Sequence, residues 1–198
     1  CAPPFPESCI IMKDYVDRWH TTDGVRLEMR RMRLDDAPQV KDSLNQLSAK
    51  ARRNRFFAAI AEFSDAAVSK FVDVDPHQEH LLVVVRREND LEIPIAGGRF
   101  IQQGDGTDCS FSLLIGDPWQ NQGIGRRLLK ALLREAAKRG LRQMYGHVLA
   151  DNQPMLRLAR SLRFSAIDSD QGEGVVKIVC DLPDAAWRRR RTVRRGPW

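Results

Sequence analysis

Two glycines stand just before a long amphipathic helix, in the run Gln120-Asn121-Gln122-Gly123-Ile124-Gly125-Arg126. A position without a side chain lets another molecule come close to the backbone. The first turn of a helix leaves N–H donors unpaired there and carries the positive end of the helix dipole. This run could therefore bind a pyrophosphate group, with Arg126 and Arg127 beside it as further cations.

The same glycines have a plainer interpretation, in which Gly123 and Gly125 only let the helix pack closely on a strand. Two other phosphate-binding loops do not fit the run. No Gly-Lys-Ser/Thr follows, as a P-loop requires, and the G-x-G-x-x-G spacing of a dinucleotide-binding fold is absent. The choice between packing and phosphate binding therefore depends on the elements around the run.

Those elements predict an α/β fold, with a mixed sheet flanked by helices. Alternating or short apolar runs of strand length occur at 25–30, 81–85, 93–101, 108–115, 143–149, 164–167 and 174–182. Helical spacing occurs at 35–47, 48–63, 122–139 and 151–162. Asp35 or Asp36 could cap the first helix, and Gly140 ends the third. The glycine run thus lies between a strand and a helix.

In that setting, Gln120-x-x-Gly123-x-Gly125 resembles the Q/R-x-x-G-x-G/A coenzyme A motif of the GNAT N-acetyltransferase superfamily. A second segment, Val148 to Phe164, resembles the strand-to-helix segment of the same superfamily and is most similar to bacterial Pat-type protein lysine acetyltransferases. The resemblance covers roughly residues 19–182. It implies a central, mostly antiparallel sheet that splays between the fourth and fifth strands, 108–115 and 143–149.

The resemblance also implies acetyl-CoA as the co-substrate, with its pantetheine arm in the opening between the splayed strands. Backbone groups of residues 113–115 would pair with the arm, and Asn152 would reach it while also capping a helix. The residues expected to bind the coenzyme are Leu113, Leu114, Ile115, Gln120, Asn121, Gln122, Gly123, Ile124, Gly125, Arg126, Asn152 and Met155.

Acetyl transfer needs a neutral amine, whereas a lysine amine with a pKa near 10.4 is deprotonated in only about one of 10³ molecules at pH 7. A general base therefore contributes about 10²–10⁴-fold. Pat-type relatives use a glutamate, and Ser110 occupies the matching position here. Asp108, on the same strand face, could act through a water held by Ser110 or be a solvated hairpin residue. Tyr145 could protonate the leaving thiolate or be a core tyrosine.

The resemblance thus implies an acetyl-CoA-dependent N-acetyltransferase acting on an amine, with a protein lysine as the expected acceptor. Two alternatives stay open. One is an acetyl-CoA-binding sensor or regulatory module that has lost its glutamate. The other is an acetyltransferase for small-molecule amines. No spacing of histidines, cysteines or acids indicates a metal ligand set, so no metal is expected.

Length and charge favour a single domain with basic residues concentrated at one end. The 198 residues include 42% hydrophobic ones, and six arginines fall within residues 188–198. Without these six, the chain has 26 basic and 26 acidic residues. A folded nucleic-acid-binding face is therefore not indicated. We expect a solvated tail, or less favourably a tail that contacts nucleic acid or an acidic partner.

The start of the chain is rich in proline, and no apolar run approaches the ~18 residues of a membrane span. The four cysteines are isolated, which favours a reducing, cytoplasmic compartment. We expect a leader at 1–18 outside the fold, one acetyltransferase domain at 19–183 and an arginine-rich tail at 184–198.

Overall fold

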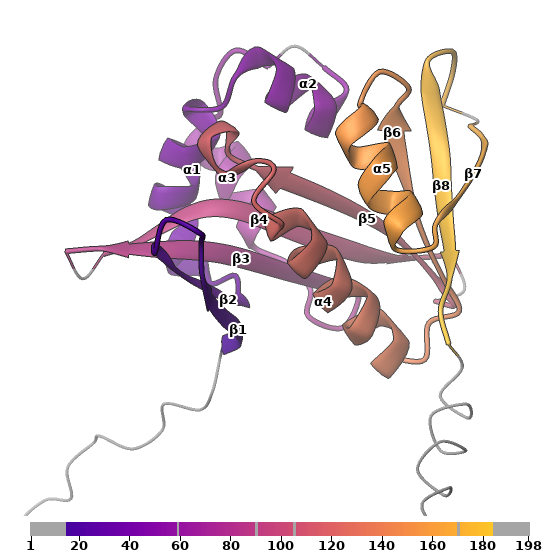
Figure 1. Cartoon of the computed structure of the whole chain (residues 1–198), viewed down its shortest axis with the longest axis horizontal. Helices are drawn as coiled ribbons and strands as arrows, with labels where there is room; N and C mark the ends of the chain where they lie inside the picture. Colours follow the sequence, from indigo (N-terminus) through magenta and orange to yellow (C-terminus); the bar gives the residue numbers. More distant parts are fainter. Residues whose placement is uncertain (1–14, 59, 90, 105, 170, 184–198) are drawn as a thin grey trace, which may run out of the picture.

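A computed structural model describes residues 15–183 except 59, 90, 105 and 170. Eight strands form one sheet in the order β1-β2-β3-β4-β5-β6-β8-β7 (Figure 1). The strands are β1 Tyr15–His20, β2 Arg26–Arg31, β3 Glu79–Glu88, β4 Leu91–Gln103, β5 Asp108–Ile115, β6 Gln143–Leu149, β7 Ser165–Asp168 and β8 Val175–Asp181. All neighbours are antiparallel except β5 and β6. The expected mixed, mostly antiparallel sheet is confirmed.

Helices cover both faces of this sheet. The described helices are α1 Ala37–Asn45, α2 Ala49–Phe56, α3 Asp65–Val72, α4 Ile124–Lys138 and α5 Gln153–Ser161, with two short 3-10 turns, η1 Leu34–Asp36 and η2 Asp117–Trp119. The apolar sides of α4 and α5 share one core with the sheet. Helices α1, α2 and α3 enclose a second core. Figure 1 shows α4 and α5 running in front of the strands. The central helix α4 is amphipathic, so it buries one side, including Leu128 and Leu132, and leaves its cations in solvent.

Two elements differ from the sequence-based prediction. Strand β1 begins at Tyr15 and pairs with β2, so residues 15–18 belong to the sheet and not to the leader expected at 1–18. The helix expected over 48–63 is two helices. Helix α2 ends at Phe56, because Phe57 adopts a left-handed conformation, and α3 begins after Ser64, whose side chain accepts a hydrogen bond from the amide of Ala67. The rest of the expected leader, and the tail from residue 184, lie outside the described residues.

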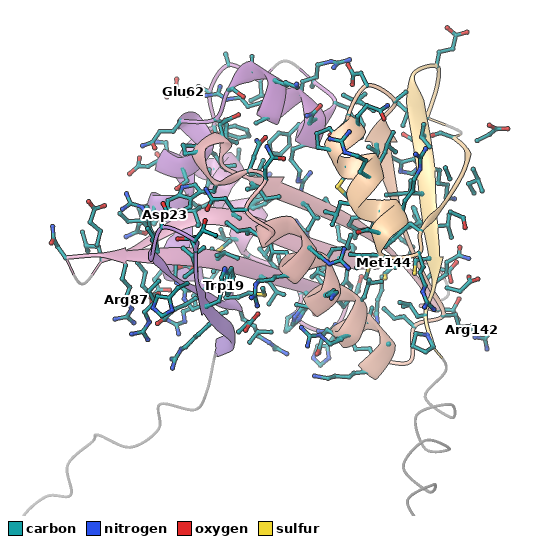
Figure 2. All side chains as sticks on the ribbon, viewed as in Figure 1. Trp19, Asp23, Glu62, Arg87, Arg142 and Met144 are labelled. Atoms are coloured by element: carbon teal, nitrogen blue, oxygen red, sulfur yellow. The ribbon has the colours of Figure 1, made fainter. Side chains whose placement is uncertain are left out.

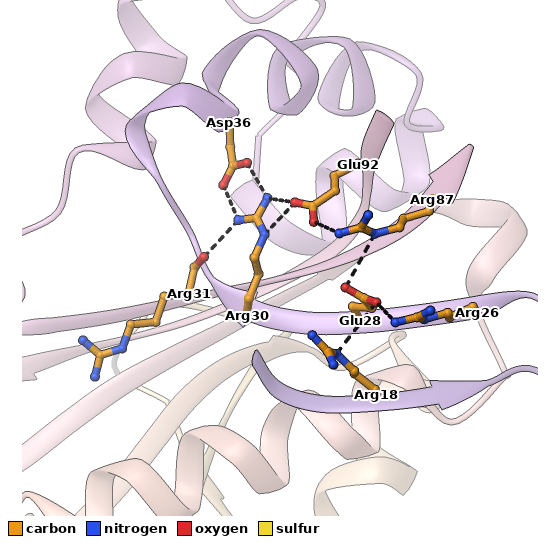
Figure 3. A network of polar contacts seen from close by, with 8 residues as sticks. All are labelled: Arg18, Arg26, Glu28, Arg30, Arg31, Asp36, Arg87 and Glu92. Atoms are coloured by element: carbon orange, nitrogen blue, oxygen red, sulfur yellow. Dashed lines mark hydrogen bonds and ion pairs between the residues drawn. The ribbon is translucent and has the colours of Figure 1, made fainter. Parts of the chain in front are cut away.

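A buried ion cluster ties β2 to η1 and β4. Arg30, almost fully buried on β2, donates to both oxygens of Asp36 and to Glu92 at 2.6–2.9 Å (Figure 3). Asp36 stands at the start of α1, but its carboxylate binds Arg30 and makes no side-chain cap there. The same carboxylate also accepts from the amide of Arg33 at 2.8 Å, so Asp36 caps η1 and not α1 as the sequence predicts.

Candidate functional site

The central sheet splits between β5 and β6. Strand β5 pairs with β4 along its whole length, but it pairs with β6 only over Asp108–Ser110. Strand β6 meanwhile stays paired with β8 over Gln143–Leu149. Beyond Ser110 no β5–β6 pairing continues among the described residues, so the edge of β5 that faces β6 offers backbone groups that can bind another molecule. The expected splay between these strands is confirmed.

An aromatic ring fills the point where the strands diverge. Phe111 of β5 lies against Gly146 of β6 so closely that a Cβ atom on Gly146 would be 2.7 Å from the ring. The ring of Phe164 packs against the ring of Phe111, with the centroids 5.3 Å apart. Any residue larger than glycine at position 146 would collide with Phe111, so this contact helps to set the split.

A cleft of about 530 Å³ opens at this split. Its walls come from β4 and β5, the loop before α4, β6, the start of α5, and α2. Eleven of the twelve residues expected to bind a coenzyme line it, and Gln122 does not. Gln122 instead donates from Nε2 to the carbonyl of Pro118 at 3.0 Å, within the loop.

The loop before α4 brings backbone donors to this cleft. Gly123 precedes the helix with a φ of +78°, and a Cβ atom there would meet nothing within 4 Å. The first hydrogen bond of this turn runs from the amide of Arg127 to the carbonyl of Gly123, so the amides of residues 124–126 precede the helical ladder. Gln120 Nε2 donates to the carbonyl of Ile115 at 3.2 Å and fixes the loop on β5. These features, called the cradle below, are of a kind that can hold an anion.

The two glycines of the motif have different surroundings. A Cβ atom on Gly125 would lie 3.0 Å from Cδ1 of Ile115 and 3.2 Å from Cδ2 of Leu158. Gly125 therefore serves the close packing of α4 against β5 and α5. Gly123 lines the cleft and has open space around it, so phosphate binding stays a prediction for Gly123, whereas Gly125 has the close contacts of the packing interpretation.

The two arginines after the glycines also have different partners. Arg126 lines the cleft, and its Nη1 donates to the hydroxyl of Ser161 at 2.7 Å. Arg127 instead pairs with Asp17 of β1 at 2.8 Å and lies 4.8 Å from the ring centroid of Trp19, which Figure 2 labels. The expectation that both cations flank the cradle is wrong for Arg127, because its guanidinium pairs with Asp17 of β1 and does not line the cleft.

Asn152 and Met155 lie at the start of α5, on the opposite wall of the cleft. The side-chain oxygen of Asn152 accepts a hydrogen bond from the amide of Met155 at 3.3 Å. Asn152 is thus the cap of α5, as the sequence predicts, and it stands at the cleft as well.

The three catalytic candidates occupy different places. Ser110 lines the cleft, and its hydroxyl accepts from Nε2 of Gln103 at 3.2 Å. Asp108 does not line it and accepts a hydrogen bond from the hydroxyl of Thr107 at 3.4 Å. Tyr145 lies opposite Ser110 in the sheet register, outside the cleft, with the ammonium of Lys177 4.6 Å from its ring centroid. The structure therefore brings Ser110, but neither Asp108 nor Tyr145, together with the coenzyme candidates.

Several residues of the cleft wall are not among the site residues predicted from the sequence. Arg55, Phe57, Arg99 and His147 all line it. Phe56 and Phe63 pack together with their ring centroids 5.1 Å apart, whereas Phe57 is exposed and adopts a left-handed conformation. Helix α2 is polar nearly all round, so no periodic pattern could show which side faces the cleft. Within the described part of the chain, no aspartate or glutamate lines this cleft.

A second cleft of about 180 Å³ lies between the sheet and the α1–α3 side. It shares five wall residues with the first, namely Arg55, Arg99, Ser112, Leu114 and Trp119. The two clefts therefore adjoin at the end of β5 that faces α2.

Asp117 links the loop before α4 to α2. Its carboxylate accepts from both the amide and the hydroxyl of Ser48, at 2.9 and 2.7 Å, where α2 begins. Partial burial raises the pKa of Asp117, but these hydrogen bonds outweigh burial and lower the pKa below its ordinary value of 3.8. Ionised Asp117, which lines the second cleft, therefore fixes the start of α2 to the loop before α4.

We expect Asp117→Ala to lower the free energy of unfolding by about 0.5–1 kcal/mol at pH 7. Because the folded pKa of Asp117 is depressed, its contribution is complete above the ordinary pKa and is lost as pH falls through the lower folded value. Urea unfolding of both proteins at pH 7 and at acid pH measures this. A stability difference that persists in acid would contradict the assignment.

No helix among the described residues is long and apolar enough to cross a membrane. In that same part of the chain, no group of three or more histidine, cysteine or acidic residues is placed to hold a metal ion. Cys109 and Cys180 carry free thiols, and burial raises the pKa of Cys109 to about 12.

Comparison with protein families places residues 42–164 in the acetyltransferase (GNAT) family. An acetyltransferase of Pseudomonas aeruginosa is 28% identical over 150 residues, which are 75% of this chain and 81% of that protein. Acetyltransferase Pat of Mycolicibacterium smegmatis is 30% identical over 130 residues. These are 65% of this chain but only 38% of that longer protein.

Solved structures share the fold. The GNAT domain of S. lividans PAT superposes with a TM-score of 0.74 at 23% identity, covering 84% of this chain and 96% of that domain. The Salmonella typhimurium protein yncA, solved with its cofactor acetyl-CoA, gives a TM-score of 0.64 at 18% identity, covering 81% and 96% of the two chains.

Proposed function

This chain belongs to the acetyltransferase (GNAT) family, and on that basis we propose that it transfers the acetyl group of acetyl-CoA to an amine, with a protein lysine as the acceptor. The resemblance to Pat-type enzymes supports the choice of acceptor. The observation that carries the proposal is the meeting, in one cleft, of the unpaired edge of β5 and the anion cradle at Gly123.

These residues fit acetyl-CoA, which supplies an activated acetyl group when bound. The amides at the start of α4 would bind its phosphates, and Arg126 would add a cation at the cleft wall. Backbone groups along residues 111–115 would pair with the amides of its pantetheine arm. Asn152 and Met155 would flank that arm from α5.

The acceptor amine must lose a proton, and Ser110 cannot take it near neutral pH. Asp108 acting through a water remains one hypothesis, although it lies outside the cleft. We favour His147, because it lines the cleft and histidine is the side chain that most often serves as a general base. In this proposal Ser110 only orients, and Gln103 fixes its hydroxyl.

Release of coenzyme A thiol from acetyl-CoA, measured with a lysine-rich protein and with a panel of small amines, tests the proposal. Lysine-dependent release supports protein acetylation, and release only with small amines supports the alternative acceptor class. A second function, an acetyl-CoA-binding sensor, is favoured by the lack of any carboxylate on the described cleft wall. Thermal stabilisation by acetyl-CoA without turnover of any amine would identify that function.

Placing a carboxylate at position 110 should increase turnover. We expect Ser110→Glu to raise kcat/KM at pH 7 by about 10-fold or more, within the range that a general base contributes. Ser110→Gln has nearly the same shape without the basic group and is the matched control. Equal rates for the two variants would show that a carboxylate at this position does not take up the proton.

A further inference from the structure

Arg55 carries a charge that the described protein does not neutralise. Its guanidinium lies 4.9 Å from the ring centroid of Phe56 and 5.8 Å from that of Phe71. No carboxylate among the described residues forms an ion pair with it. The neighbouring charged group is Arg99, whose guanidinium stacks on the same Phe71 ring at 6.0 Å. The partly buried Arg55 thus faces a like charge.

Arg30 is a buried arginine with a structural role, and its surroundings can be compared with those of Arg55. Two carboxylates surround Arg30, and they raise its pKa against the opposing effect of burial (Figure 3). At Arg55 the direction is reversed, because burial and the nearby Arg99 lower the pKa to about 10. Arg55 is still charged at neutral pH. A buried charge is stable only when it is paired, and Arg55 lacks the carboxylate partners that Arg30 has.

Arg99 has only part of its donor set occupied. Its Nη2 pairs with Glu79 of β3, but its buried Nε has no hydrogen-bond acceptor in the described part of the chain. With one carboxylate for two guanidiniums, the pair Arg55 and Arg99 keeps a net positive charge. Arginine donors match the geometry of carboxylate oxygens, which they can bind in bidentate fashion.

This charge lies at the point where the two clefts adjoin. Arg99 stands opposite Ser112 in the β4–β5 register, and Ser112 is one step along the strand face, about 7 Å, from Ser110. The cradle at Gly123 and the start of α5 line the first cleft but not the second. An acceptor that enters from the second cleft would therefore meet Arg55 and Arg99 as its amine approaches Ser110.

We propose that the acceptor is an amine that carries a carboxylate, and that Arg55 together with Arg99 binds this carboxylate. The inference rests on the proposed acetyl transfer and adds the chemical class of the acceptor. The carboxylate belongs either to a small amino acid-like molecule or to an acidic residue beside a lysine in a peptide.

Two compounds test this directly. Nα-acetyl-lysine and Nα-acetyl-lysinamide present the same side-chain amine with and without a carboxylate. We expect wild-type kcat/KM to be at least about 10-fold higher for the acid, as expected for a hydrogen-bonded charge pair. Arg55→Gln should bring the ratio to within about twofold of one. Peptides with Asp-Lys-Asp and Asn-Lys-Asn sequences, assayed in parallel, show whether a peptide or a small molecule supplies the carboxylate.

Lys50→Gln is the matched control, because it removes one positive charge from an exposed position of the same helix and should keep the wild-type ratio. Arg55→Gln should also retain the thermal stability of the wild type, since it removes an uncompensated charge. Calorimetric titration of both lysine compounds in the presence of coenzyme A measures the same preference without turnover.

Equal binding and equal turnover of the acid and the amide would overturn the proposal, even if acetyl-CoA binds and reacts normally. A preference for succinyl-CoA over acetyl-CoA that depends on Arg55 would also overturn it, because the charge would then serve the acyl group. Failure of the proposed function is a separate result, in which acetyl-CoA neither binds nor reacts. If acetyl-CoA binds but no amine reacts, the calorimetric ratio decides the proposal.

Discussion

Replacing Gly123 with leucine is expected to weaken acetyl-CoA binding by at least about 100-fold while the protein remains folded. The Cβ of residue 123 would enter open space at the cleft, and a leucine side chain there would keep phosphates from the amides of the first turn of α4. Losing two hydrogen bonds to a charged group costs about 3–6 kcal/mol, which corresponds to 10² or more in affinity. Isothermal titration of the variant with acetyl-CoA measures the loss.

Gly140→Leu provides the matched control. Gly140 follows the other end of α4 with a φ of +80°, and a Cβ atom there also meets nothing within 4 Å. Both substitutions therefore impose a similar backbone strain of about 1–2 kcal/mol, but only residue 123 lines the cleft. Equal affinities in the two variants would show that Gly123 does not border the phosphate site.

Replacing Gly146 with valine is expected to lower the free energy of unfolding by about 1–3 kcal/mol, the range for overpacking a core. The new Cβ would lie 2.7 Å from the ring of Phe111, so either the ring or β6 must move. For a chain of this size, the loss corresponds to a fall in Tm of about 2–12 °C. Differential scanning calorimetry measures it.

The double variant Phe111→Ala/Gly146→Val tests whether the loss of stability comes from the clash with the Phe111 ring or from valine in the strand itself. Removing the ring makes room for valine, so the coupling between the two substitutions should be favourable by about 1 kcal/mol or more. Strictly additive losses would mean that Phe111 and Gly146 do not set the split together.

The sequence predicted the strand-to-helix setting of the cradle because each part leaves a local pattern. Alternation marks β5, the apolar stripe marks α4, and asparagine marks the start of α5. The split between β5 and β6 was expected from a resemblance carried by the Gln120–Gly125 run and by residues 148–164. No local pattern would have revealed it, because it depends on where the pairing of two strands stops.

The positions of three charged side chains could not be predicted from the sequence, because they depend on contacts that form only in the folded chain. Arg127 is close to the cradle in sequence. Its side chain, however, contacts Asp17 and Trp19 of β1, which lie more than 100 residues earlier. The sequence around Asp36 is typical of a cap for α1, but its carboxylate accepts hydrogen bonds from Arg30 in the folded chain. Arg55 sits on a helix without an apolar side, so only the folded chain shows that it borders both clefts.

The affinity of the unmodified protein for acetyl-CoA tests the whole account most directly. Isothermal titration calorimetry should show one molecule bound per chain, with a dissociation constant in the range of about 1 μM to 1 mM typical for enzyme substrates. A titration without heat of binding, together with a Tm that millimolar acetyl-CoA leaves unchanged, would contradict the proposed cradle and with it the acetyl transfer.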